Sequence, residues 1–453
     1  MPALSSPGGR ETPVRSSPEG RKVPAFPLNA RQASRNHRLG VLNGVFIELA
    51  MALTNPGMVL TVLVRALGGS NALVGLLPTI RFGGWFLPQF IIGGWVQSRP
   101  RRVPIIVAMD AIRIVLYGAI GTALYAFGAR SPSLALGAFL VMFTITRFSA
   151  GSGAVPRLDL FGSFVPPWQR ARFIAIKSFW GGLAAFSAGF VVRFVLDERL
   201  VPFPNNYGLL FMGATLCFVA ATALISRAAE PPARITARQR GLVRQFTYGR
   251  TLLKDRRYRR YVIMRVLIGM IRIGSPFYIV YALDRLDAPV AIAGTYLSII
   301  TFARILSNPL WSKLLYKRGH KVVLQSATAL LASSALLAVV LPIPIRAMHL
   351  TGNAAALTFG LVLVVQGLAG GGHSISLLPI LYEIAPPAER ASYIGLLNTI
   401  MGPTSLISAI SGSLIDRIGF EPMFLVAGAM VIAAYLVGTG LRLPRAPETE
   451  GQT

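Results

Sequence analysis

The amino-acid sequence predicts an all-α membrane protein whose twelve transmembrane helices form two pseudo-symmetric halves of six helices each. Three observations support this fold class: the composition, the length of the apolar runs, and an internal repeat. Of the 453 residues, 53% are hydrophobic and only 14% are charged. Soluble proteins carry about a quarter charged residues, so the composition favours a membrane protein.

The apolar runs have the length of membrane-spanning helices, which need roughly 20 mostly apolar residues. Six runs occupy the first half of the chain and six the second, and mostly short loops join them. The predicted spans are 40–64, 72–96, 103–128, 133–155, 172–196, 207–226, 261–283, 289–311, 321–345, 354–382, 392–415 and 421–442.

The basic residues predict the orientation, because Lys and Arg are enriched in cytoplasmic loops. They are concentrated in the N-terminal tail, the 97–102 loop, the 227–260 segment and the 312–321 loop. Both termini are therefore expected to face the cytoplasm, in a plasma or inner membrane. The net charge of +28 does not indicate a nucleic-acid partner, because the basic residues lie in short segments between apolar runs. Membrane lipids are the expected surroundings.

Five segments are expected along the chain. Residues 1–38 are rich in Pro, Ser and Arg, which predicts a disordered cytoplasmic tail and not a signal peptide. Residues 39–226 and 261–442 are the predicted N-terminal and C-terminal six-helix bundles, and 443–453 is a C-terminal tail. The basic 227–260 segment between the bundles is compatible with an amphipathic helix on an anionic membrane surface or with a solvated linker.

An internal repeat relates the two halves. Residues 166–174 read PPWQRARFI and residues 386–394 read PPAERASYI, at an offset of 220. Gly75 and Gly294 recur at the nearly equal offset of 219. Several matches at nearly one offset indicate a duplicated six-helix unit.

With this repeat, the chain resembles the major facilitator superfamily over nearly all of 39–442. The family signature follows the second helix and reads Gly, three residues, Asp-Arg, one residue, Gly-Arg-Arg/Lys. Gly94, Arg99 and Arg102 fit this signature, whereas Ser98 replaces the Asp and Arg101 replaces the Gly.

The loop after the eighth span carries a second copy of the signature, which retains Lys317, Gly319 and Lys321 and also lacks the Asp. Another phrase similar to the family is GSLIDRIG at 412–419. The resemblance implies that the signature loops latch the two halves in one facing state. Without the Asp, the latch is expected to be weaker or differently built, and the alternative is that the basic residues only fix the topology.

The resemblance implies a secondary active transporter that rocks two halves around a central small-molecule site. The sequence lacks a phosphate-binding GxxxxGK[ST] loop, a cluster of metal-ligating residues and a GxSxG nucleophile motif. We therefore expect no ATP-driven pump, no enzyme, no metal and no cofactor, and we expect a monomer.

Ionisable residues inside the predicted spans are candidate functional residues, because each costs several kcal/mol unless it is paired or hydrated. The resemblance implies that spans one, four, seven and ten line the cavity. The candidates on these spans are Glu48, Arg147, Arg272, His373 and the polar Gln366.

Other charges lie on spans outside that quartet. Asp110 and Arg113 are spaced i,i+3 in the third span, which predicts a structural pair. Arg81 and Arg304 leave a structural and a functional role equally open.

Two hypotheses follow. In the first, Glu48 pairs with Arg147, and a substrate that competes for Arg147 makes Glu48 take up a proton. In the second, Arg147 and Arg272 clamp an anionic substrate from opposite halves, since guanidinium groups match carboxylate and phosphate geometry. His373 is either a proton site, because imidazole titrates near neutrality, or a polar residue at a helix break.

The favoured function is therefore a proton-coupled carrier of a small organic anion. The first alternative is a proton-coupled efflux pump for amphipathic drugs, in which Glu48 contacts the cation. Drug–proton antiporters of the family often carry a Gly-Pro motif in the fifth span. Here that span reads SFWGGLAAFSAGF, without a proline, which makes the drug-efflux alternative less favourable. A lipid flippase or a transporter-like sensor is the alternative from another class.

Overall fold

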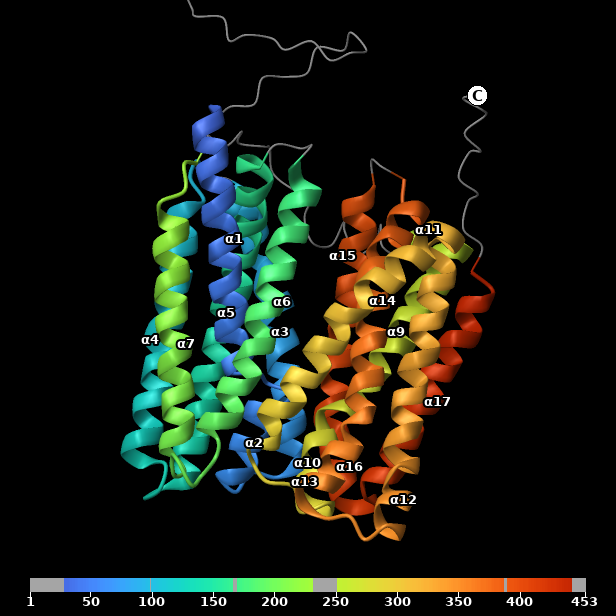
Figure 1. Ribbon diagram of the computed structural model, residues 1–453. Helices are drawn as coiled ribbons and strands as arrows, with labels where there is room; N and C mark the ends of the chain where they lie inside the picture. Colours follow the sequence, from blue (N-terminus) through green and yellow to red (C-terminus); the bar gives the residue numbers. More distant parts are fainter. Residues whose placement is uncertain (1–27, 98, 166–168, 231–250, 387–388, 442–453) are drawn as a thin grey trace, which may run out of the picture.

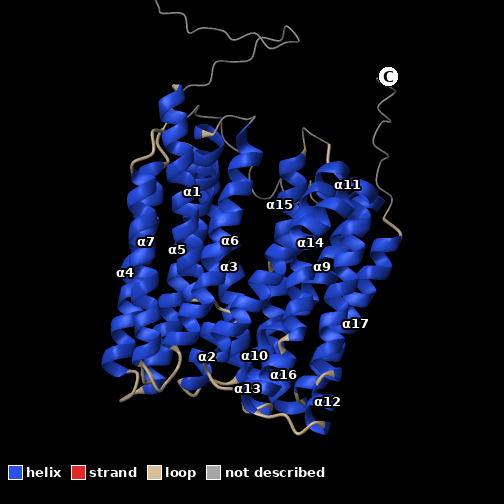
Figure 2. Ribbon diagram, viewed as in Figure 1, coloured by secondary structure: helices blue, strands red, loops and turns tan. Residues whose placement is uncertain are grey.

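The computed structural model describes residues 28–97, 99–165, 169–230, 251–386 and 389–441. Within these ranges all regular structure is helical, as Figure 2 shows. The predicted all-α fold class is therefore confirmed.

The helices form two bundles that stand side by side (Figure 1). The first bundle, coloured blue to green, contains the helices up to α7. They are α1 (Ala30–Leu53), α2 (Val59–Ala66), α3 (Asn71–Gln97), α4 (Val103–Phe127), α5 (Pro132–Phe164), α6 (Arg170–Val195) and α7 (Asn205–Ser226).

The second bundle, coloured yellow to red in Figure 1, contains the remaining helices. They are α9 (Arg256–Gly269), α10 (Tyr278–Arg285), α11 (Ile292–Val340), α12 (Pro342–Ala347), α13 (Gly352–Phe359), α14 (Leu361–Ile384), α15 (Arg390–Met401), α16 (Ile407–Ile418) and α17 (Phe420–Thr439). Three short 3₁₀ helices interrupt it: η2 (Met270–Ile273), η3 (Ser275–Phe277) and η4 (Pro403–Leu406).

Nine helical stretches in the described part of the chain are long and apolar enough to cross a membrane. The predicted spans 40–64 and 72–96 are not among them, and two predicted spans fall in the single stretch Ile292–Ala347. This stretch is kinked at Gly319, which has φ 76°. The count of twelve crossings therefore stays a prediction, although every predicted span is mostly helical.

The first helix begins earlier than expected. Helix α1 starts at Ala30, where Asn29 and Gln32 form a reciprocal capping box that satisfies backbone N–H groups at the helix start. Residues 30–38 are thus helical, and the prediction of a disordered tail up to residue 38 was wrong for this part. Residues 1–27, and 231–250 of the basic linker, lie outside the described residues.

Several spanning stretches are broken near their middle or end. Asn55, Pro56 and Gly57 separate α1 from α2, and η2 and η3 separate α9 from α10. Proline removes a backbone donor and glycine lowers helix propensity, so the sequence favours breaks here. In membrane proteins such breaks are tolerated where the chain lines a cavity.

The two bundles contact each other through α6 against α11 and α3 against α16. Gly75 and Gly294, the pair that the repeat relates, lie in these two contacts. A Cβ on Gly75 would lie 1.9 Å from the Ser408 carbonyl oxygen, and one on Gly294 would lie 2.4 Å from the Gly189 carbonyl oxygen. The repeated glycines therefore allow the same close backbone approach in each half.

Candidate functional site

A cavity of about 470 Å³ lies between the two bundles. Helices α1, α3 and α6 of the first bundle and α9, α11, α14 and α15 of the second contribute to its wall. The polar and charged residues that line it are Glu48, Asn55, Arg81, Arg265, Arg272, Thr301, Arg304, Gln366 and His373. Four arginines thus share the cavity with one carboxylate.

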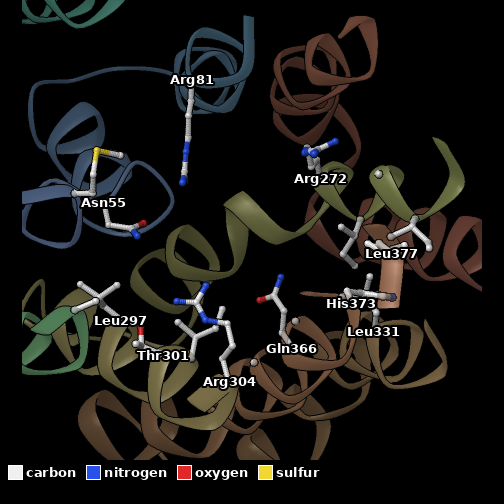
Figure 3. A pocket seen from close by; sticks show the side chains of 18 of the residues that line it. Asn55, Arg81, Arg272, Leu297, Thr301, Arg304, Leu331, Gln366, His373 and Leu377 are labelled. Carbon is white, nitrogen blue, oxygen red and sulfur yellow. The ribbon is translucent and has the colours of Figure 1, made fainter. Parts of the chain in front are cut away.

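Glu48 on α1 and Arg81 on α3 supply the charges of the first bundle. Both side chains are exposed, and the space they face is the cavity. Glu48 is close enough to attract Arg81 and also Lys177 on α6. In Figure 3 the Arg81 side chain points into the cavity, toward the side from which Arg304 of α11 extends. Arg81 and Arg304 are close enough to repel each other.

Arg272 lies on η2, where the helix break turns it toward the first bundle. Its guanidinium carbon lies 4.3 Å from the centre of the Phe82 ring, and its Nη1 donates a long hydrogen bond of 3.4 Å to Thr404 Oγ1. The aromatic face offsets part of the charge. Arg272 still has no carboxylate partner among the described residues.

Arg265 and His373 extend the basic wall along α9 and α14. The Nε atom of Arg265 is buried and has no hydrogen-bond partner. His373 Nε2 lies 3.1 Å from Thr328 Oγ1. Sequence reasoning missed Arg265, although its spacing of seven residues from Arg272 puts both near one helix face.

The structure corrects the predicted role of Arg147. This residue does not line the cavity. It lies behind Met51, with its Nη1 3.6 Å from the Met51 sulfur, and its Nη2 donates a hydrogen bond of 2.6 Å to Tyr117 Oη. Arg147 therefore turns into the first bundle, and within the described part of the chain it forms no ion pair with Glu48. The predicted Glu48–Arg147 pair and the Arg147–Arg272 clamp are both absent from this conformation.

The remaining predicted cavity residues are present, and two others join them. Glu48, Arg272, His373 and Gln366 line the cavity, as expected from their spans. Arg81 and Arg304, which lie outside the predicted quartet of spans, line it as well.

Asp110 organises a buried charge cluster inside the first bundle. Its carboxylate lies 2.8 Å from Nη2 of Arg113 and 2.8 Å from Nη2 of Arg157. Thr222 Oγ1 lies 3.3 Å away. The predicted Asp110–Arg113 pair is confirmed, and sequence reasoning missed Arg157 as its second cation.

The residues of the predicted latch make contacts inside their own bundles. Arg102 forms an ion pair of 2.6 Å with Asp159 and donates to the Arg99 carbonyl. Lys321 Nζ donates to the Thr439 carbonyl at 2.8 Å. Gly94 lies near the end of α3, and Lys317 and Gly319 are exposed at the kink of α11. Ser98 lies outside the described residues, so the latch stays a prediction.

The opposite end of the interface carries contacts between the bundles. Arg65 on α2 and Asp284 on α10 form an ion pair of 2.8 Å. Asn71 on α3 donates to Asp416 on α16 at 2.6 Å. Asp416 belongs to the 412–419 phrase that the sequence singled out. We call Arg65, Asn71, Asp284 and Asp416 the closed end.

Comparisons with known proteins agree with this architecture. The sequence model of the Major Facilitator Superfamily matches residues 263–453. Among curated proteins, none matches the chain in sequence. Among solved structures, a nucleoside transporter is similar with a TM-score of 0.67, 15% identity and coverage of 90% of this chain and 99% of that chain.

Two further solved structures have the same fold. A D-xylose–proton symporter has a TM-score of 0.67 and 14% identity, over 93% of this chain and 99% of that chain. A peptide transporter variant has a TM-score of 0.65 and 17% identity, over 89% of this chain and 93% of that chain. The chain thus has the fold of these transporters over about nine-tenths of its length, and residues 263–453 match the Major Facilitator Superfamily in sequence. The nine candidate spans in the described part of the chain agree with several membrane crossings.

Proposed function

We propose that this major facilitator superfamily transporter carries a small organic anion through the cavity between its bundles, coupled to protons through Glu48. The observation that carries the proposal is the charge of the cavity wall, which has four arginines and one carboxylate. A cavity with this excess of positive charge attracts anions and repels cations. It therefore disfavours the alternative of an efflux pump for cationic drugs.

The arginines of the cavity lack the counter-charges that membrane interiors normally require. Among the described residues, Arg81, Arg265, Arg272 and Arg304 form no ion pair. A carboxylate or phosphate of the substrate would provide the missing negative charge, and a guanidinium group can bind it through two parallel hydrogen bonds.

An anion would also help the two bundles to close on each other. Arg81 belongs to the first bundle, whereas Arg272 and Arg304 belong to the second. The charge of Arg81 is near enough to those of Arg304 and Arg272 to repel them. The Arg65–Asp284 pair at the closed end is about one-third exposed, and such pairs contribute about 0–1 kcal/mol. Neutralisation of the cavity charges by an anion would therefore favour the approach of the bundles.

Glu48 is the proposed proton site because it is the only carboxylate in the described cavity wall. Arg81 is among the charges near Glu48, and its guanidinium group attracts the carboxylate. A substrate anion bound to Arg81 would weaken that attraction and add a negative charge, so Glu48 would take up a proton more readily. The anion and the proton would then move together. Arg81 thus replaces Arg147 as the proposed arginine partner of Glu48.

The anion proposal is tested with Arg272→Gln in proteoliposomes that take up a panel of carboxylates and organic phosphates. We expect kcat/KM for the best anion to fall by about 10- to 100-fold, since a hydrogen bond to a charged group contributes about 1.5–3 kcal/mol. Arg257→Gln is the matched control, because Arg257 is exposed at the start of α9. Equal uptake by wild type and Arg272→Gln, or a preference for cationic drugs, would contradict the proposal.

The coupling proposal is tested with Glu48→Gln in the same vesicles. A pH gradient should drive accumulation of the anion by the wild-type protein and not by Glu48→Gln. Exchange of labelled for unlabelled anion should persist in the variant, because exchange needs no net proton movement. Unchanged accumulation by Glu48→Gln would exclude this residue as the coupling site.

A further inference from the structure

The basic residues of the cavity lie at two levels along the helix axes. Arg272 and Gln366 define the deeper level, and Arg81 is near enough to Arg272 and Arg304 for their charges to interact. Arg265 lies seven residues before Arg272 on the α9–η2 stretch, and His373 lies seven residues after Gln366 on α14. Helical rises of about 1.5 and 2 Å per residue separate the two levels by about 10–12 Å.

Helix directions place the second level nearer the end that carries the chain termini. Helix α9 begins near that end in Figure 1, and α14 runs toward it, so Arg265 and His373 both lie on that side of Arg272 and Gln366. In Figure 3, Gln366 and His373 are neighbours along the cavity wall, and Leu331 and Leu377 lie near His373. The second level belongs entirely to the second bundle.

The charge of Arg265 has no counter-charge within the described part of the protein. Its Nε atom is buried without a hydrogen-bond partner. Its charge is near enough to His373 to act on the imidazole. No carboxylate faces it in the described cavity wall, where Glu48 is on the opposite bundle. Because Arg265 lines the cavity and is only partly buried, an anionic ligand there would supply the counter-charge that the described protein does not.

The wall between the two levels is apolar. Ile268 and Gly269 lie between Arg265 and Arg272 on α9, and Gly367 and Gly370 lie between Gln366 and His373 on α14. These residues offer no hydrogen-bonding side chain to a ligand. They suit a hydrocarbon spacer, because burying its CH₂ groups away from water is favourable.

We propose that Arg265 and His373 form a second anion subsite, so that the preferred substrate is an elongated organic dianion. One acidic group binds among Arg81, Arg272 and Arg304, the other binds at Arg265, and an apolar spacer joins them. This inference rests on the proposed function, because the deeper group of arginines is taken as the first subsite.

The test measures binding of α,ω-dicarboxylates, from succinate to sebacate, to the purified full-length protein by calorimetry. Monocarboxylates of matched chain length are measured alongside. We expect an optimum length at which the dicarboxylate binds at least about 10-fold more tightly than its monocarboxylate, as a second charge-assisted contact would give.

Arg265→Gln should remove this advantage, because it should weaken dicarboxylate binding at least about 10-fold more than monocarboxylate binding. Arg265→Lys, which keeps the charge, should retain part of it, and Arg257→Gln should retain all of it. The inference is overturned if the wild-type protein gains nothing from the second carboxylate at any length, or if Arg265→Gln weakens both ligand types equally. Binding of monocarboxylates without any gain refutes this inference alone, whereas no binding of either type also refutes the proposed function.

Discussion

Two groups of arginines inside the helical bundles differ in their partners. Arg113 and Arg157 share the carboxylate of Asp110, at 2.8 Å each, inside the first bundle. The cavity arginines, of which Arg272 and Arg304 are examples, face open space without a carboxylate at ion-pair distance in the described structure. The difference separates charges that hold helices together from charges that we propose bind a substrate anion.

The Asp110 cluster is compensated from several sides. The guanidinium carbon of Arg113 lies 3.9 Å from the centre of the Phe218 ring, and Thr222 also contacts the carboxylate. Asp110 itself is only 2% exposed. Breaking a buried ion pair by removing one partner is strongly destabilising, because an uncompensated charge is left behind. Here one carboxylate serves two cations, so its loss would uncover both.

The largest expected effect is therefore that of Asp110→Asn, which keeps the size of the side chain and removes its charge. The free energy of unfolding should fall by about 3–5 kcal/mol. The readouts are the midpoint of thermal unfolding in detergent and the yield of monodisperse protein.

Arg304→Gln provides the contrast in the same assay. It removes a cavity cation that has no partner, so the unfolding midpoint should stay the same or rise. The distinction between the two groups fails if Asp110→Asn unfolds at the wild-type temperature, or if Arg304→Gln is destabilised to the same extent.

A smaller effect is expected for Arg65, a third kind of arginine that is paired across the two bundles. Arg65→Asp places two carboxylates opposite each other at the closed end and should favour conformations in which this end is open. Exposed ion pairs contribute about 0.2–1 kcal/mol, so the population should shift by roughly 2- to 5-fold.

The shift is measured as the labelling rate of Asn55→Cys in a Cys217→Ser background, with a membrane-impermeant maleimide added from the side of the closed end. Asn55 lines the cavity near the α1–α2 break. The exchanged pair, Arg65→Asp with Asp284→Arg, should return the rate to that of the parent. A rate that responds to neither variant would show that the pair does not hold this end closed.

Much of the fold could be predicted from the sequence, because the apolar runs and the repeat are local or periodic features. The repeat even located two glycines, Gly75 and Gly294, at equivalent contacts between the bundles. The start of the first helix was predicted less well. The sequence before residue 39 is polar, yet α1 already begins at Ala30 with a capped first turn. Capping depends on two side chains and leaves no hydrophobic pattern.

The cavity could be predicted only in part. Glu48, Arg272, Gln366 and His373 were found because the resemblance assigned their spans to the cavity. Arg81 and Arg304 were not assigned to the cavity, because they lie on the second and eighth spans. The order of a span along the chain does not determine which of its residues face the centre of the molecule.

Arg147 illustrates the opposite error. Its span and its depth both suggested the cavity, yet the guanidinium group finds Tyr117 at 2.6 Å and lies beside Phe143 at 5.0 Å inside the first bundle. Rotamer and local packing decide between these positions, and neither is encoded in residue spacing.

The sequence by itself predicts a helical membrane transporter in two related halves, and it shows an excess of arginine. The lengths of the apolar runs and the internal repeat are properties of the chain itself, so the sequence alone reveals them. Only the tertiary structure decided which arginines are paired, because a partner such as Asp110 for Arg157 is 47 residues away along the chain. The same packing left Arg81, Arg265, Arg272 and Arg304 facing one cavity, and that arrangement carries the proposed function.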